Sequence, residues 1–131
     1  LGLEQLKRLD SHIDKRRKNF KIWIENLNSD LYYTNFDMSG NSNFALPLVM
    51  HNSSKLNNVC NILKEYGVEY RLGTIGGGSQ ANQPYVKNSK HKIIGTLEVS
   101  NFIQNNALYI GNHPELSIDQ INNLCERLNN V

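Results

Sequence analysis

The residues best suited to bind a ligand lie in one loop, from Tyr70 to Tyr85, with the sequence YRLGTIGGGSQANQPY. A strand-like run that contains Arg71 opens into three consecutive glycines, and a polar amide-rich segment follows. Each glycine weakens a helix or strand by about 1 kcal/mol relative to alanine, so this run favours a loop with positive φ angles or close approach to a ligand. Exposed backbone N–H groups and an arginine fork bind anions. The loop is therefore the candidate site for an anionic or hydroxyl-rich ligand, and a flexible loop with a surface arginine is the alternative.

The same loop lacks the groups that a catalytic centre needs. The run Gly76-Gly77-Gly78 does not fit the phosphate-binding pattern G-x-x-x-x-G-K-[ST], and no helix pattern starts directly behind it, which also excludes the dinucleotide fingerprint. We expect His113, in the turn GNHP, to point toward the same end of the sheet, although a lone histidine in a turn is more often structural. The other three histidines have no acidic or cysteine partners at metal-ligand spacing. The sequence predicts neither a catalytic residue nor a metal site.

Composition limits the class of protein. The 131 residues are 39% hydrophobic and 20% charged, which is typical of one globular domain. No apolar run approaches the roughly 20 residues of a membrane span, and a net charge of +2 is too small to argue for nucleic acid. Cys60 and Cys125 are each expected on a helix with apolar neighbours, as reduced core thiols of a cytoplasmic protein. The chain starts without methionine and inside a helix pattern, which suggests a piece of a longer protein.

The strongest helix pattern covers about Gly2 to Leu27. Its apolar residues recur at steps of three and four and include Leu6 and Leu9. A basic cluster at Lys15 to Lys18 is more often a solvated face than a ligand site, and a nucleic-acid contact over Lys15 to Lys21 is a third, weaker hypothesis. Trp23 is expected in the core or in a subunit contact.

The rest of the chain predicts alternating strands and helices. FALPLVM, Phe44 to Met50, is a buried strand in which Pro47 favours an edge or a bulge. Asn52 and Ser53 can cap a helix over about 54 to 66 that Gly67 ends, and Val68 to Leu72 is the next strand.

After Tyr85, the segment Val86 to Gly95 is expected to be a surface loop. Thr96 then caps a short helix with Leu97, Phe102 and Ile103 inward, and Ala107 to Ile110 forms a strand. Ser117 and Gln120 form a capping-box pair for a last helix. The predicted fold is α+β: a small antiparallel or mixed sheet with helices on one side, a long helix over 1–28 and an α+β core over 44–131.

Three segments together resemble one family. GLEQLKRLD at the start, YRLGTIGGGSQANQPY in the middle and LYIGNHPELSIDQINNLCERL at the end are similar, in order and spacing, to the DegT/StrS-type nucleotide-sugar aminotransferases. The resemblance spans nearly the whole chain. It implies that residues 1–131 are the C-terminal small domain of a PLP-dependent enzyme that transfers an amino group from glutamate to a nucleotide-linked keto-sugar, in the cytoplasm, for surface-polysaccharide biosynthesis.

The resemblance also implies what this chain lacks and what it supplies. The PLP lysine and the cofactor phosphate ligands belong to a preceding N-terminal domain, so the chain alone is expected to bind no cofactor and to be inactive, and the whole enzyme is expected to be a homodimer. This chain would supply part of the sugar-nucleotide pocket. The expected substrate-binding residues are Arg71, Gly76, Gly77, Gly78, Ser79, Gln80, Gln83, Tyr85, Asn112 and His113.

Two alternatives stay open. The GGG and GNHP segments depart from the commoner aminotransferase pattern and look closer to the PLP-dependent 3-dehydratases of GDP- or CDP-linked keto-deoxysugars, in which a histidine replaces the lysine and the sugar loses a hydroxyl. A stand-alone α+β module that binds a small anion or effector is the other alternative, because the chain itself contains no convincing nucleophile.

Overall fold

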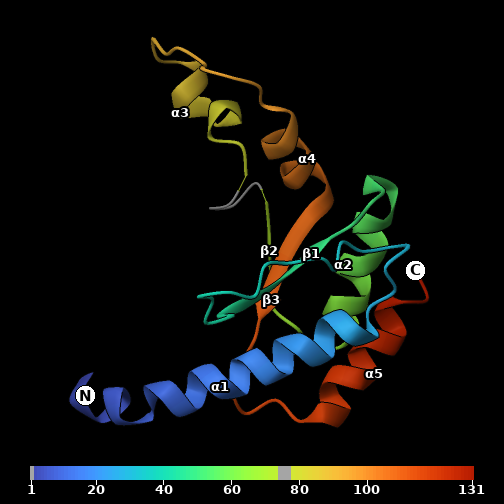
Figure 1. Ribbon diagram of the computed structural model, residues 1–131. Coiled ribbons are helices and arrows are strands. Elements are labelled where there is room, and N and C mark those ends of the chain that lie inside the picture. Colours follow the sequence, from blue (N-terminus) through green and yellow to red (C-terminus); the bar gives the residue numbers. More distant parts are fainter. Residues whose placement is uncertain (1, 74–77) are drawn as a thin grey trace.

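The first helix, α1 (Gly2–Asn26), runs along one side of the molecule, and only its second half packs against the rest. The computed structural model describes residues 2–73 and 78–131. Phe20 and Trp23 are buried, whereas Leu6 and Leu9 are 61% and 43% exposed. The predicted helix is thus confirmed, and the apolar residues of its first turns are exposed. Figure 1 shows this free end of α1 projecting beyond the sheet.

A three-stranded antiparallel sheet forms the centre of the fold. Its strands are β1 (Ala45–Val49), β2 (Tyr70–Leu72) and β3 (Ala107–Gly111), in the order β1-β3-β2. Leu46 pairs with Ile110 on one side of β3, and Tyr70 pairs with the same residue on the other. Pro47 lies in β1, an edge strand, where the missing N–H of a proline is tolerated.

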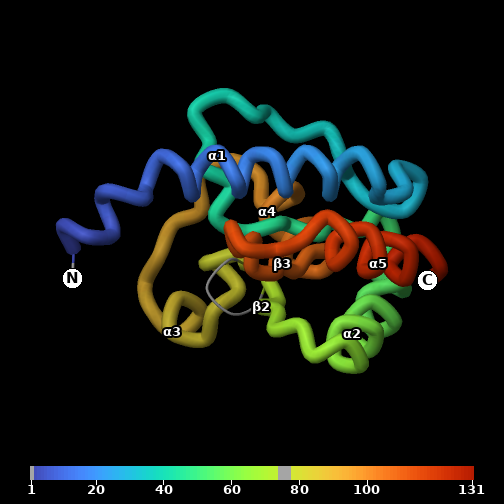
Figure 2. Tube along the Cα trace, turned by 90° about the horizontal axis from the view of Figure 1, so that it is seen from below, coloured from blue at the N-terminus to red at the C-terminus, as the bar shows by residue number. Residues whose placement is uncertain are grey.

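Helices cover one face of this sheet, as predicted. The 3₁₀ turn η1 (Ser53–Lys55) leads into α2 (Leu56–Glu65), and α5 (Ile118–Leu128) ends the chain alongside α1 in both views (Figures 1 and 2). The core between these helices and the sheet is made of side chains that are almost fully buried: Phe20, Trp23, Leu46, Leu48, Val59, Leu63, Leu108, Ile110, Ile121, Leu124 and Leu128.

Local signals set the ends of these helices. The Asn52 side chain accepts a hydrogen bond from the backbone N–H of Ser54, and Gly67 has φ +64 directly after α2, the left-handed conformation that glycine adopts most easily. Ser117 and Gln120 form both bonds of the predicted capping box at α5.

The segment between β2 and β3 differs from the prediction. Residues 80–87 contain a 3₁₀ turn, η2 (Gln80–Asn82), and a short helix, α3 (Pro84–Lys87). The sequence suggested the end of the glycine loop and the start of a surface loop at these positions. Proline at the first helical position is the signal that favours α3. The next helix, α4 (Glu98–Asn106), has Leu97 at its N-cap rather than Thr96, because the Leu97 carbonyl accepts the bond from Asn101 N–H.

The remaining expectations concern cysteines, membranes and α4 packing. Cys60 and Cys125 are both free and buried, as expected. Phe102, expected to face inward, is 42% exposed, so α4 caps one end of the sheet without entering the core. None of the described helices is both long and apolar enough to cross a lipid bilayer.

Candidate functional site

The two ends of the glycine loop touch each other. A Cβ atom added at Gly78 would overlap the carbonyl group of Gly73, and one added at Gly73 would lie 3.0 Å from Cα of Gln104. Because backbone atoms cannot move aside as the end of a side chain can, Gly78 requires glycine, and Gly73 leaves little room for a side chain. Gly76 and Gly77 lie outside the described residues. The structure thus explains why one residue of the run, Gly78, is glycine: its backbone lies against the carbonyl of Gly73.

Hydrogen bonds tie the far side of this loop to α4. The backbone N–H of Ser79 donates to Oε1 of Gln104 at 3.0 Å, and the Ser100 hydroxyl lies 3.4 Å from that of Ser79. Nδ2 of Asn82 donates to Oδ1 of Asn101 at 2.7 Å. Ser79 is buried, so in this structure its side chain faces the loop base and not the surface.

The end of the loop presents two side chains to solvent. Tyr85 is 65% exposed, and its hydroxyl donates to Oε1 of the exposed Gln80. Gln83 is half-buried and precedes α3, where its carbonyl accepts bonds from Val86 and Lys87 N–H. Gln80 and Tyr85 are therefore accessible to a ligand as they stand.

Arg71 lies on the face of the sheet that no helix covers. It pairs in register with Tyr109 of β3. Both side chains are exposed, whereas their neighbours along the two strands pack against the core. One guanidinium nitrogen donates to the carbonyl of Tyr70 at 3.2 Å and another is 3.9 Å from Glu69. These contacts are exposed, and such pairs contribute little to stability. The guanidinium can exchange them for a ligand anion at small cost.

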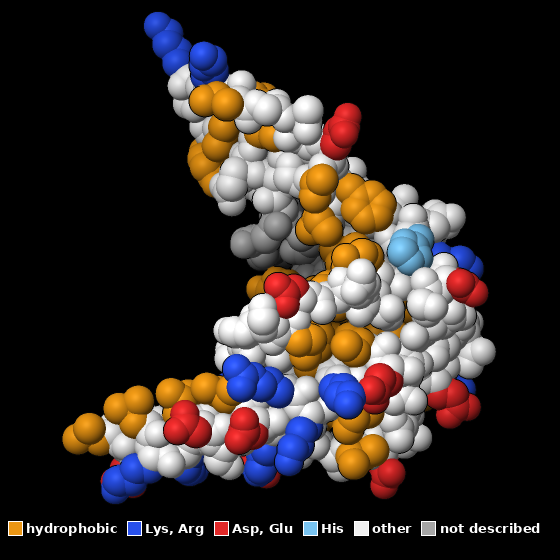
Figure 3. Space-filling model, viewed as in Figure 1, with side chains coloured by type: hydrophobic (Ala, Val, Ile, Leu, Met, Phe, Trp, Pro, Cys, Tyr) orange, Lys and Arg blue, Asp and Glu red, His pale blue; other side chains and the backbone are white. Residues whose placement is uncertain are grey.

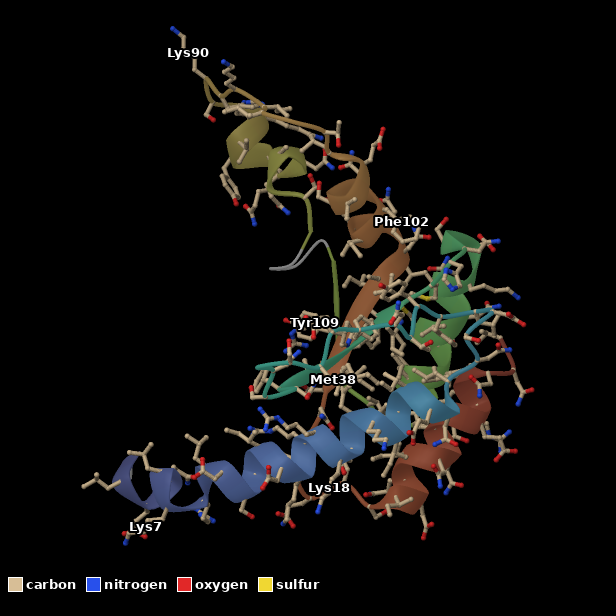
Figure 4. The ribbon with its side chains drawn as sticks, viewed as in Figure 1. Lys7, Lys18, Met38, Lys90, Phe102 and Tyr109 are labelled. Atoms are coloured by element: carbon tan, nitrogen blue, oxygen red, sulfur yellow. The ribbon has the colours of Figure 1, made fainter. Side chains whose placement is uncertain are left out.

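This uncovered face is apolar and hollowed. Tyr109 lies at the hollow between the free end of α1 and the arm formed by α3 and α4 (Figures 3 and 4). A cavity of about 220 Å³ sits on the same face, and its lining includes Phe36, Pro47, Val49, Ile103 and Tyr109. This uncovered face was not predicted from the sequence. The signal was present: FALPLVM and ALYI are apolar at consecutive positions, as in strands that are buried on both faces.

Asn112 and His113 lie at the opposite end of the sheet from the glycine loop. The loop follows β2, which runs antiparallel to β3, so it lies beside the start of β3, whereas Asn112 and His113 follow its end. The expectation that His113 points to the same end is therefore wrong. Nδ2 of Asn112 donates to the carbonyls of Arg16 and Asn43, both at 2.8 Å, and Asn112 is 1% exposed. These contacts join α1 to the start of β1 and the end of β3.

The basic cluster on α1 is engaged within the chain. Lys15 pairs with Glu115 at 2.8 Å, and this ammonium holds the pKa of the Glu115 carboxyl below its usual range. Arg17 Nε donates to the Asn41 carbonyl at 2.8 Å. Nothing in these contacts favours a nucleic-acid interface.

The described residues offer neither a metal-binding cluster nor an enclosed lysine. No group of three or more His, Cys, Asp or Glu side chains among them could hold a metal ion. A cofactor lysine is normally enclosed, because burial lowers its pKa and activates it. Eight of the nine lysines are exposed, and the ninth, Lys55, bonds to the carbonyl of Val131 at 3.0 Å.

The fold defines a class: an α+β domain whose described helices cover one face of a three-stranded antiparallel sheet and leave the other face uncovered. Comparison with known proteins gives the family. The model of the DegT/DnrJ/EryC1/StrS aminotransferase family matches residues 1–129, and the chain belongs to this family.

Its relatives include sugar-modifying enzymes. The chain is 32% identical over 127 residues to the GDP-4-keto-6-deoxy-D-mannose 3-dehydratase of Yersinia pseudotuberculosis, covering 95% of this chain and 32% of that protein. It is 28% identical over 126 residues to the lipopolysaccharide biosynthesis protein RfbH of Salmonella typhimurium, and this match covers 92% of this chain and 28% of that protein. The chain therefore spans about a third of the length of these relatives.

Solved structures show the same fold. A GDP-4-keto-6-deoxymannose-3-dehydratase with a trapped PLP-glutamate geminal diamine superposes with a TM-score of 0.80 at 25% identity, over 97% of this chain and 33% of that one. The Helicobacter pylori aminotransferase PseC superposes with a TM-score of 0.77 at 14% identity, over 97% and 34%, and this likeness concerns the fold alone. The predicted family and α+β fold are confirmed.

Proposed function

We propose that this chain is the C-terminal domain of a PLP-dependent 3-dehydratase that acts on a GDP-linked 4-keto-6-deoxysugar. The observation that carries the proposal is the 32% identity to a protein of that name, within a family match over residues 1–129. The aminotransferase prediction is the second candidate. It is supported by the description of the family, whereas the named dehydratases favour the alternative that the GGG and GNHP segments suggested.

The cofactor-binding domain would pack against the uncovered face. Monomeric proteins rarely expose large contiguous apolar patches, and those that do usually have a partner there. Leu3, Leu6 and Leu9 are exposed along the free end of α1, and hydrophobic atoms line the edge of α1 that borders the hollow (Figure 3). A second domain in the hollow would bury this edge together with the outer face of β1 and β3.

The roles of the chain's own residues follow from this placement. When bound by the other domain, PLP supplies an electron sink for the sugar chemistry. Arg71 would bind the substrate's diphosphate, since its guanidinium fork matches phosphate geometry. The loop Gly76 to Gln83 and Tyr85 would contact the rest of the sugar nucleotide. Asn112 and His113 are left out of this proposed site because they lie at the other end of the sheet.

The coding sequence upstream of Leu1 tests the proposal at once. We expect it to encode a larger domain that carries a histidine at the position of the PLP lysine, and a lysine there would favour glutamate-dependent aminotransfer. If no cofactor domain precedes Leu1, both candidates fail and the stand-alone binding module takes their place.

A further inference from the structure

A second cavity lies on the helix-covered side of the sheet, away from the hollow. It has a volume of about 330 Å³ and sits between α5 and the segment that joins α2 to β2. Its floor consists of Trp23, Ile110 and Leu124, which belong to the core. Its rim carries three exposed groups that can form hydrogen bonds: Tyr66, Gln120 and Asn123. This volume lies within the range of about 300 to 1,000 Å³ that is usual for small-molecule pockets.

The lining excludes a charged ligand. None of the described residues around this cavity carries a charge. An ion moved from water into such surroundings without a partner pays a large desolvation cost. The diphosphate of a sugar nucleotide and the phosphate of PLP are therefore poor ligands here. The two faces of the sheet also separate this cavity from the uncovered face, since Ile110 points to the helices and Tyr109 points to the hollow.

Trp23 lines the cavity with its indole ring, while Nε1 of that ring is enclosed by protein atoms. Its side chain is 2% exposed, and its Nε1 has no hydrogen-bond partner among the described residues. Indole N–H groups usually find an acceptor when they are buried. The amide groups of Gln120 and Asn123 contain both donors and acceptors. The cavity thus combines apolar aromatic surface with hydrogen-bonding groups and no charge.

We propose that this cavity binds an uncharged planar compound of one or two fused rings that carries a hydrogen-bonding edge, the chemical class of a lactam or a nucleobase. The rings would contact the floor, and the polar edge would meet the amides of Gln120 and Asn123 on the rim. This site is separate from the proposed sugar-nucleotide site and does not depend on that function.

The test compares two bicyclic probes of nearly equal size, 2-quinolone and naphthalene, which differ in the polar amide edge. Trp23 is the only tryptophan of the chain, so its indole N–H gives a single signal in a ¹H–¹⁵N NMR spectrum. We expect 2-quinolone to shift this signal saturably and to bind at least about tenfold more tightly than naphthalene, because one or two net hydrogen bonds correspond to such a factor. An indole signal that does not move, or equal binding of the two probes, would overturn the proposal.

Matched variants locate the site. Asn123→Phe fills the mouth of the cavity and should abolish the shift, whereas Asn122→Phe places the same ring on an exposed neighbour that does not line the cavity and should bind normally. Asn123→Ala keeps the space open but removes the amide, so it should reduce the preference for 2-quinolone and leave naphthalene binding unchanged. Normal 2-quinolone binding by Asn123→Phe, or its loss in Asn122→Phe, would contradict the assignment.

Discussion

Tyr32 is a buried phenol whose pKa links stability to alkaline pH. It is 1% exposed, and its hydroxyl donates to the carbonyl of Leu128 at 2.6 Å. Burial raises the pKa of Tyr32 well above its usual range, and burial also raises the pKa of the Cys125 thiol, from 9.0 to about 12. Both groups stay protonated in the folded chain at pH values where they ionise in the unfolded chain. The folded chain therefore has its full stability below the pKa that each group has in the unfolded chain. It loses stability as the pH rises from there toward the pKa of the same group in the folded chain.

We expect the free energy of unfolding to fall from about pH 9 upward, by about 1.4 kcal/mol per pH unit for each group once the pH exceeds its unfolded pKa. Urea unfolding at several pH values, followed by Trp23 fluorescence, measures this slope. Tyr32→Phe should remove the part that begins near pH 10, whereas Tyr33→Phe, at a 44% exposed position, should leave it in place. An unchanged slope in Tyr32→Phe would mean that this phenol does not carry the effect.

Arg71 and Asn112 were both expected to bind substrate, and the structure separates them. In the longer protein that we propose, Arg71→Ala should raise the KM for the sugar nucleotide about tenfold or more without changing stability, because its present contacts are exposed. Asn112→Ala should instead lower the free energy of unfolding by about 2 kcal/mol, since it removes one buried and one partly buried hydrogen bond. Steady-state kinetics and urea unfolding of both variants distinguish the roles, and a stable Asn112→Ala with a raised KM would restore the original expectation for Asn112.

Among the helices and strands, the sequence best predicts features that depend on hydrogen bonds between neighbouring residues, such as the ends of helices. The capping box of Ser117 and Gln120 begins α5, and Gly67 follows α2 with a positive φ, because both signals depend on neighbouring backbone groups. Periodicity also identifies the apolar stripe of α1. It cannot say what covers that stripe, and Leu6 and Leu9 prove to be exposed. The predicted position of His113 was wrong for a similar reason. It depends on the direction of the strands, which the local sequence does not specify.

The two ends of the glycine loop, Gly73 and Gly78, meet in one backbone contact, which we call the neck of the loop. Gly78→Ala would place a Cβ against the carbonyl of Gly73, so the loop must rearrange, at a cost of about 1 to 3 kcal/mol in the free energy of unfolding. Gly111→Ala is a matched control, because nothing lies within 4 Å of a Cβ added there. Thermal or urea unfolding compares the two. Equal stability of both variants would show that the neck is not rigid.

The free end of α1 should matter only when a second domain is present. Leu6→Glu should leave the stability of the 131-residue chain unchanged within about 0.5 kcal/mol, because the side chain is already exposed. In the longer protein the same change should destabilise, since it would bury an unpaired carboxylate. Lys7→Glu is the control on the opposite side of α1, where Figure 4 shows Lys7 pointing away from the hollow. Equal effects of both changes in the longer protein would argue against docking in the hollow.

At the scale of the whole molecule, a sheet with apolar residues on both faces has helices on only one of them. The hollow, the exposed leucines of α1 and Arg71 all belong to the other side (Figure 3). The chain spans about a third of the length of its relatives, which is consistent with a face that another domain completes. Aminotransfer and 3-dehydration both stayed open from the sequence, because no catalytic residue was predicted among these 131 residues.

The product formed by the longer protein tests the central proposal most directly. The encoded polypeptide, supplied with PLP and glutamate, is incubated with GDP-4-keto-6-deoxymannose, and the sugar product is identified by mass spectrometry and NMR. We predict a sugar that has lost its 3-hydroxyl group and gained no nitrogen. A product that carries a new amino group would contradict the dehydratase proposal and establish the aminotransferase instead.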